Sequence, residues 1–196
     1  MTEPLKNHIK AYVDISDEKL DHYCSAFSLK KLKKKDFILR EGEICGFEGF
    51  VVKGCFKVSH IDHHGAEQVL YFGIENWWIS DIDSFVNRIP SKLNIQAIED
   101  SEILVISKES KEKLYMEIPE VEKLMRLKFQ QSIIALQRRI IDNLSKTSDE
   151  RYLDFLREYP ETANRLTNIQ IAAYLGVTPE FISRIRRKIV NKTEDK

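Results

Sequence analysis

The apolar positions of this chain follow one pattern in its first part and another in its second. Between residues 37 and 107 they form short clusters separated by turn residues, at 37–39, 49–52, 56–58, 69–72, 93–95 and 103–106. Short apolar runs at this spacing predict an antiparallel sandwich, barrel or jelly roll. In the sequence Asp62-His63-His64-Gly65 a glycine can supply the positive φ of a hairpin turn.

Beyond residue 118 the spacing becomes helical. Residues 120–146 contain neither Gly nor Pro, and their apolar side chains recur every three or four positions, which predicts one long amphipathic helix. A second helix is predicted over 147–160, because Thr147 and Glu150 have the spacing of a capping box. The apolar face of the long helix consists of Met125, Phe129, Ile133, Leu136, Ile140 and Leu144.

Residues 167–189 predict two short helices joined by a tight turn. Thr167 and Gln170 have capping-box spacing at the start of the first helix, and Gly176 suits the left-handed conformation that ends it. Thr178 can cap the second helix, with Pro179 at its first position. This combination is typical of a helix-turn-helix. Ala172 is the small residue that we expect where the two helices cross. The joint core of the two helices is expected to consist of Ile171, Leu175, Val177, Ile182, Ile185 and Ile189.

The second of these helices is predicted to present a positively charged outer surface. In a DNA major groove, Arg binds guanine O6 and N7, and Glu accepts from cytosine N4. Glu180 and Arg184 are one turn apart and would address neighbouring base pairs, whereas Arg187 and Lys188 would contact phosphates. The alternative is a helical hairpin with a solvated basic face. The predicted DNA-binding residues are Thr167, Thr178, Glu180, Ser183, Arg184, Arg186, Arg187 and Lys188.

Composition narrows the functional classes. The chain has 31 Lys and Arg against 31 Asp and Glu, so nucleic-acid binding depends on where the basic residues gather. Its three cysteines are scattered along the chain, which favours thiols without a chemical role over a disulfide framework or a metal site. No apolar stretch approaches the ~20 residues that cross a bilayer, so we expect a cytoplasmic protein without a membrane partner. No arrangement typical of nucleophilic catalysis is visible, and we expect no enzyme.

The order of these elements resembles the Crp/Fnr family of bacterial regulators. The likeness rests on Phe-Ile-Leu-Arg-Glu-Gly-Glu at 37–43, Val-Val-Lys-Gly at 51–54, and the block 167–189, above all Thr-Pro-Glu-Phe-Ile-Ser-Arg at 178–184. It implies an α+β fold: an antiparallel β-roll or jelly roll at 1–118, a long dimerisation helix at 119–146, and a helix-turn-helix domain at 147–196 without an obvious C-terminal wing.

The resemblance also implies partners. In the family the long helix forms a two-fold coiled coil, so a homodimer is expected whose interface is Met125, Phe129, Ile133, Leu136 and Ile140. Two recognition helices about one DNA turn apart match a palindromic site in double-stranded DNA. RNA polymerase is the further partner that the resemblance implies.

The chain departs from the family pattern at the ligand site. Members that bind cyclic nucleotides carry Gly-Glu for the ribose and Arg-Ser for the phosphate, where this chain has Ser80-Asp81 and Ser91-Lys92. Asp81 could accept ribose hydroxyls, but Lys92 replaces a bidentate arginine by a point charge, so cyclic AMP is not expected. Three cysteines also fall short of the four that hold the family's iron–sulfur cluster, and no cofactor is expected. An unknown ligand would contact Phe72, Trp78, Ser80, Asp81, Ser91 and Lys92.

Two other interpretations stay open. His60, His63, His64 and Glu67 invite comparison with cupin-like metalloenzymes, although neighbouring strand residues point to opposite faces and a solvated hairpin turn is favoured. The chain could also be a nucleotide-binding regulatory subunit that acts on a protein partner. The lysine-rich segment 30–35 is interpreted as a solvated edge that discourages pairing with other strands.

Overall fold

The computed structural model of the protein describes residues 1–194, with side chains as far as Lys188. It divides into two compact units. The first comprises residues 1–60 and 71–132, and the second comprises residues 61–70 and the chain from 133 onward. Among the described residues, no helix has the length and apolar character that a membrane span requires.

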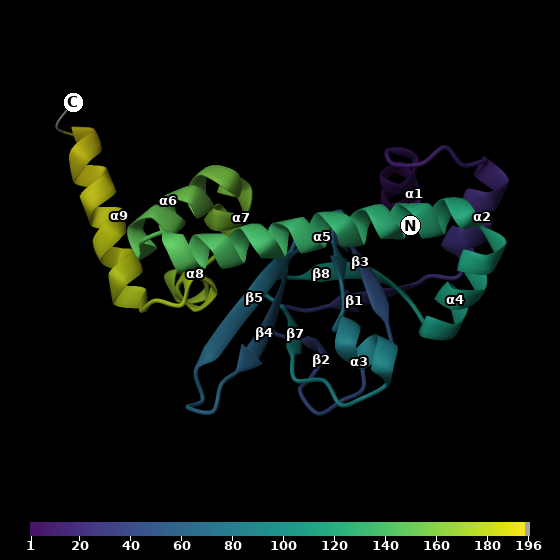
Figure 1. Ribbon diagram of the computed structural model, residues 1–196, viewed down its shortest axis with the longest axis horizontal. Coiled ribbons are helices and arrows are strands. Elements are labelled where there is room, and N and C mark those ends of the chain that lie inside the picture. The colour runs from purple at the N-terminus through teal and green to yellow at the C-terminus, as the bar shows by residue number, and fades with distance from the viewer. Residues whose placement is uncertain (195–196) are drawn as a thin grey trace. The chain divides into compact units, whose positions relative to one another are not determined.

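The strands form two four-stranded antiparallel sheets, as the spacing of apolar clusters predicts (Figure 1). One sheet has the order β1-β8-β3-β6 and the other the order β2-β7-β4-β5. Every predicted cluster lies in a strand, except that Leu93 of the cluster 93–95 precedes β7, while β1 and β6 were not predicted. The strands are β1 (Ser28–Leu32), β2 (Phe37–Leu39), β3 (Glu48–Lys53), β4 (Phe56–Ile61), β5 (Glu67–Gly73), β6 (Trp78–Ile79), β7 (Asn94–Ala97) and β8 (Ser101–Ile106).

The unpredicted strand β1 explains the lysine-rich segment. Lys30 and Lys31 lie in β1, which is at the edge of its sheet beside β8. Lys31 faces Glu102 across the pair, with Nζ 3.0 Å from the carboxylate. Charged side chains on an edge strand discourage pairing with other molecules, which agrees with the interpretation of this segment.

Strands β3 and β8 are apolar at consecutive positions because both of their faces are buried. Phe50 and Leu104 point into one cluster, which the helices of the first unit cover, whereas Val51 and Ile103 point into the core between the sheets. Successive strand residues alternate between faces, so two buried faces require an unbroken apolar run. The covering helices are α1 (Glu3–Lys10), α2 (Asp17–Ser25), α4 (Lys108–Glu117) and the first part of α5 (Pro119–Ser145). A further short helix, α3 (Ile82–Asn87), follows β6.

The second unit is helical apart from the residues 61–70 around the β4–β5 turn. Asp62 Oδ1 accepts from the backbone N–H groups of His64 and Ala66, and Gly65 has a φ of +82°, which confirms the predicted hairpin turn. The helices after α5 are α6 (Ser148–Glu158), α7 (Pro160–Arg165), α8 (Asn168–Leu175) and α9 (Pro179–Glu194).

Two contacts set the geometry of this unit. The Thr147–Glu150 capping box at the start of α6 is confirmed, with Thr147 N donating to Glu150 Oε2 at 2.8 Å. Arg139 on α5 donates to the carbonyl oxygens of Val69, Leu70 and Tyr174, and its guanidinium lies 4.3 Å from the Tyr174 ring centroid. One guanidinium therefore joins α5, β5 and α8.

His8 on α1 is a half-buried titratable group in the first unit. Its Nε2 is buried and has no hydrogen-bond partner among the described atoms, and its ring lies 5.1 Å from that of Phe50. Burial, and secondly the positive charge of Lys128, lower the pKa of His8 from 6.5 to about 4. The neutral imidazole is therefore the form that the folded unit favours.

We expect His8 to make the first unit sensitive to acid. Because the pKa of His8 is lower in the folded state, its contribution to stability is present above pH 6.5 and is lost as the pH falls from 6.5 towards 4. Urea unfolding of His8→Gln should depend less on pH in this window than that of the wild type. His64→Gln, in the exposed hairpin turn, is the control and should keep the wild-type slope. Equal slopes for His8→Gln and the wild type would contradict the assignment.

Candidate nucleic-acid interface

The turn between α8 and α9 is built by local hydrogen bonds, as predicted. At the start of α8, Thr167 N donates to Gln170 Oε1 at 2.8 Å and Gln170 N donates to Thr167 Oγ1 at 3.3 Å, which closes the capping box. At its end Gly176 has a φ of +66° and its N–H donates to the Ala172 carbonyl. That left-handed residue reverses the chain without the steric cost of a side chain.

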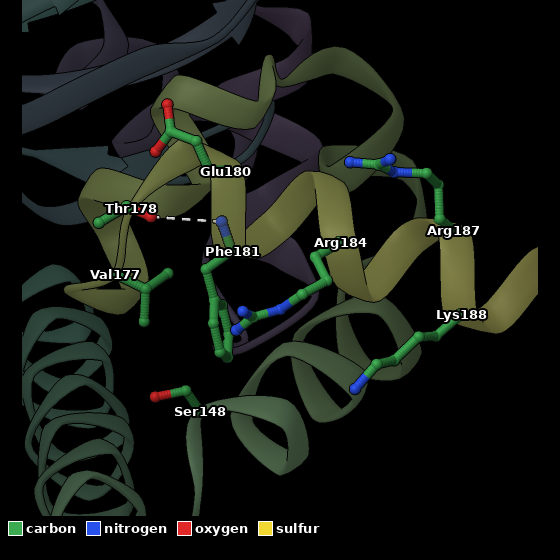
Figure 2. A pocket seen from close by; sticks show the side chains of 8 residues that line it. All are labelled: Ser148, Val177, Thr178, Glu180, Phe181, Arg184, Arg187 and Lys188. Carbon is green, nitrogen blue, oxygen red and sulfur yellow. Dashed lines mark hydrogen bonds between the residues drawn. The ribbon is translucent and has the colours of Figure 1, made fainter.

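The second helix of the pair also starts as predicted. Pro179 is its first residue, and Thr178 Oγ1 accepts from the backbone N–H of Phe181 at 3.2 Å (Figure 2). The cap satisfies a backbone donor that has no partner inside the helix. The helix therefore begins at a fixed residue, which fixes the direction of each side chain that follows.

Apolar packing holds α9 against α8. Val177 departs from the predicted core, because it is partly exposed and faces an open groove, and the side chain of Ile189 lies outside the described residues. The remaining core residues are buried as predicted: Ile171, Ala172, Leu175, Ile182 and Ile185.

An open groove of about 680 Å³ runs along the outer face of α9 (Figure 2). It includes five of the predicted DNA-binding residues, which are Thr178, Glu180, Arg184, Arg187 and Lys188. The prediction missed its other three lining residues, Ser148, Val177 and Phe181. Helical periodicity accounts for the grouping, since Glu180, Phe181, Arg187 and Lys188 all lie within about 60° of Arg184 around an ideal helix axis.

Two predicted contacts do not lie on this face. Arg186 follows Arg184 by two residues, about 200° around the helix, and so points inward. It is half-buried, and its Nε donates to the hydroxyl of the buried Tyr152 at 2.7 Å. Ser183 is also half-buried, accepts from Asn168 Nδ2 at 3.2 Å and donates to the Pro179 carbonyl at 3.0 Å. The expectation that both side chains belong to the outer surface is corrected by these contacts.

Thr167 is exposed, but it lies at the start of α8 and not in the groove along α9. Its hydroxyl also donates to Gln170 Oε1 at 3.1 Å. A contact of Thr167 with DNA would therefore come from the first helix of the pair.

The groove carries more positive than negative charge. Arg184, Arg187 and Lys188 are exposed, against one exposed carboxylate, that of Glu180. Among the described side chains, no ion pair engages these three cations. The Arg184 guanidinium lies 5.1 Å from the centroid of the Phe181 ring, a cation–π distance. Arg187 Nε donates to the Ser183 carbonyl at 3.4 Å, and the terminal guanidinium N–H groups of Arg184 and Arg187 stay available for an anionic or base partner.

Only some of the residues expected to hold a ligand in the β-roll lie close to one another. Trp78 packs on the helix-covered side, with its ring 5.3 Å from Phe50 and 6.1 Å from Phe27. Phe72 is buried and Lys92 is exposed. Ser80, Asp81 and Ser91 do come together, and all three are buried.

These three residues already satisfy one another or the neighbouring backbone. Asp81 caps α3 by accepting from Ser84 N, and its second oxygen accepts from Ser91 Oγ at 2.6 Å. Ser80 Oγ donates to the Phe47 carbonyl at 2.9 Å. Burial raises the pKa of Tyr71 to about 12, and its protonated hydroxyl donates to the Ser80 carbonyl. Asp81 is thus a structural hydrogen-bonding group here, and this arrangement does not fit a carboxylate that accepts ribose hydroxyls.

Thiols and imidazoles do not assemble a metal site within residues 1–194. Cys24, Cys45 and Cys55 are buried, and no disulfide joins them. Burial is the main cause that raises the pKa of Cys24 to about 11, so this thiol stays protonated near neutral pH.

The long helix carries an apolar stripe that starts later than predicted. Met125 is 2% exposed and packs in the core of the first unit, so it is not available as an interface residue. Phe129, Ile133, Leu136 and Ile140 are exposed. The stripe also includes three residues that were not assigned to the interface, Ile134, Ile141 and Leu144.

Comparison with known proteins agrees with this geometry. The family described as cyclic nucleotide-binding domain matches residues 29–117. The transcriptional activator protein Anr of Pseudomonas protegens is 25% identical over 215 residues, covering 94% of this chain and 86% of Anr.

Two solved structures share the fold. FixK2 from Bradyrhizobium japonicum has a TM-score of 0.75 at 20% identity, over 85% of this chain and 86% of that one. A Crp/Fnr-family regulator from Eubacterium rectale has a TM-score of 0.71 at 18% identity, over 91% and 85% of the two chains. Over most of its length the chain therefore shares the fold of these two proteins, and in sequence and fold it is similar to the Crp/Fnr family of transcriptional regulators.

Proposed function

We propose that the protein is a sequence-specific DNA-binding regulator that places α9 in the major groove. The observation that carries this proposal is the outer face of α9, where Arg184 is central and Glu180, Arg187 and Lys188 flank it. Arg184 and Glu180 can bond to base edges, and Arg187 and Lys188 can neutralise phosphates. Because DNA binding requires no bond-making, we propose no catalytic role for this surface. We propose that the protein acts in the cytoplasm, where its DNA target would be found.

We further propose that it acts as a homodimer on a palindromic site. Support comes from the stripe of exposed apolar side chains on α5, where Ile133 is 56% and Leu136 is 57% exposed. Their spacing of three and then four residues, continued by Ile140, is that of a two-stranded coiled coil. A two-fold dimer presents two identical reading helices to two half-sites.

RNA polymerase is the protein partner that gene activation would require. The relative Anr is named a transcriptional activator, and the same role is proposed here on that likeness.

We propose that cyclic AMP is not a ligand of the β-roll of this chain. A cyclic phosphate needs a well-placed cation, and Lys92, the candidate by position, is exposed, with its carbonyl accepting from His60 Nδ1. The candidate ribose acceptor, Asp81, is bonded to Ser91 and to Ser84 N. Regulation by another small molecule stays a proposal without an assigned ligand.

Addition of 1 mM cyclic AMP should therefore leave the melting temperature of the protein unchanged within error. A ligand at 100 times its Kd would stabilise the folded state by about 2.7 kcal/mol, which raises the melting temperature by several degrees. Differential scanning calorimetry with and without the nucleotide measures this shift. A rise of several degrees would show that the hydrogen bonds of Asp81 and Ser91 open to admit the ligand.

Arg184→Ala should lose sequence discrimination and keep stability. The bidentate contact of an arginine with guanine is worth about 1–3 kcal/mol of discrimination, about 5- to 150-fold in relative affinity. We would select bound duplexes from a random pool with both proteins, and then compare the affinities for the selected and for a scrambled duplex. Undiminished discrimination by Arg184→Ala would remove Arg184 from the proposed base readers.

Arg186→Ala is the matched control, because it removes the same side chain from the opposite face of α9. Loss of its hydrogen bond to Tyr152 should cost about 1–3 kcal/mol of stability, since the Tyr152 hydroxyl stays buried. Arg184→Ala should stay within about 0.5 kcal/mol of the wild type. Thermal unfolding separates the two variants, and the reverse order of stabilities would contradict the orientation of α9.

Ile133→Asp should convert the dimer into monomers. A charge in the middle of the apolar stripe would be buried without a partner in a coiled coil, which costs several kcal/mol. Light scattering after size exclusion gives the mass directly. Glu122→Asp, near the start of α5, is the control and should stay dimeric. A dimer that survives Ile133→Asp would refute the α5 interface.

A further inference from the structure

We propose that Phe181 reads the 5-methyl group of a thymine next to the base pair that Arg184 addresses. The inference rests on the proposed function, because it requires α9 to lie in the major groove. It adds an apolar reading position to a surface whose other predicted contacts are polar or charged.

The position of Phe181 makes it a contact residue and not a core residue. The buried side of α9 is formed by Ile182 and Ile185, whereas Phe181 is partly exposed and lines the groove together with Val177. Figure 2 shows its ring directed into the groove on the same side as the Arg184 side chain. A large aromatic side chain half open to solvent retains apolar area that a partner can cover.

The backbone of Phe181 is held in place. Its N–H donates to Thr178 Oγ1 at 3.2 Å, so the residue lies in the capped first turn of α9. In a recognition helix the N-terminal residues are those that meet base edges. A side chain on a fixed backbone position at this end can select among bases.

The chemistry of the groove selects thymine. In the major groove, thymine is the base that offers an apolar group, its 5-methyl, while the other base edges offer hydrogen-bond donors and acceptors. Val177 borders the same groove and extends the apolar surface. A phenyl ring placed against a methyl group buries apolar area on both sides, and against a cytosine edge it would leave the base without that contact.

Phe181 also positions Arg184. The guanidinium lies 5.1 Å from the ring centroid, close enough for a cation–π attraction that restrains the long arginine side chain. An arginine held before binding loses less conformational entropy when it bonds to a base. We therefore expect thymine and the base read by Arg184 to be adjacent in the half-site.

The test uses two random duplex pools, one synthesised with thymine and one with uracil, which lacks the 5-methyl group. The purified full-length protein selects from each pool, and the bound fractions are sequenced. With thymine, the recovered half-site should contain T beside the position that Arg184→Ala degrades. With uracil, the preference at that T position should disappear while the rest of the half-site is kept.

Binding constants sharpen the result. A single thymine-to-uracil change at that position in the recovered duplex should weaken wild-type binding about fourfold, the factor expected for one methyl group. Phe181→Ala should bind both duplexes equally. Phe181→Leu should still favour thymine, because leucine keeps an apolar surface there. Leu153→Ala, an exposed apolar residue on α6, is the control and should behave as the wild type.

The outcomes separate this inference from the proposed function. A sequence-specific wild type that tolerates uracil at every half-site position would overturn the role of Phe181 and leave the proposed function intact. A thymine preference that survives in Phe181→Ala would do the same. A protein that selects no duplex from either pool would overturn both.

Discussion

The packing of α9 against α8 across the turn at Gly176 is the constraint on which the account of this protein depends. The two helices are in contact, Ile171 and Leu175 on α8 and Ile182 and Ile185 on α9 are all buried, and burial of this side of α9 fixes its rotation about its own axis. With the rotation fixed, Arg184 faces outward while Arg186, two residues later, bonds to the interior Tyr152. That apolar contact decides which of the charged side chains of α9 face outward. A helix rotated by two positions would bury one cation and expose the other.

The β-roll shows how a shared fold can carry different chemistry. A buried polar group without a partner is costly, so a site that is shaped for a ligand leaves its polar groups open to one. In this chain Ser80, Asp81 and Ser91 find their partners within the protein, and Trp78 packs on the other side of the strand. Residues 29–117 match the cyclic nucleotide-binding domain, and on the basis of these hydrogen bonds we propose that this chain shares the scaffold and not the ligand.

Sequence reasoning succeeded where short-range rules decide the structure. Thr147 and Thr167 predict helix starts and Gly176 predicts a helix end, because capping hydrogen bonds and a left-handed glycine involve only a few neighbouring residues. The apolar clusters predict the strands. It failed where partners are remote in sequence. β1 is lysine-rich and is a strand because β8 pairs with it, and α1 has two buried residues, Leu5 and Ile9, whose partners lie elsewhere in the unit. The errors in the site residues on α9 have another cause, because they could have been avoided from the sequence. Counting 100° per residue along α9 would have placed Arg186 inward and Phe181 outward. The burial of Met125 needed the tertiary fold.

The central claim is that two copies of α9 read two half-sites of one duplex. Selection from a random duplex pool by the wild-type protein at near-physiological salt, followed by sequencing, tests it most directly. The account predicts a palindrome whose half-sites are separated by about one helical turn, 10–10.5 base pairs from centre to centre. Recovery of a single, non-repeated site would contradict the dimer, and recovery of no preferred sequence would contradict the reading of DNA by α9.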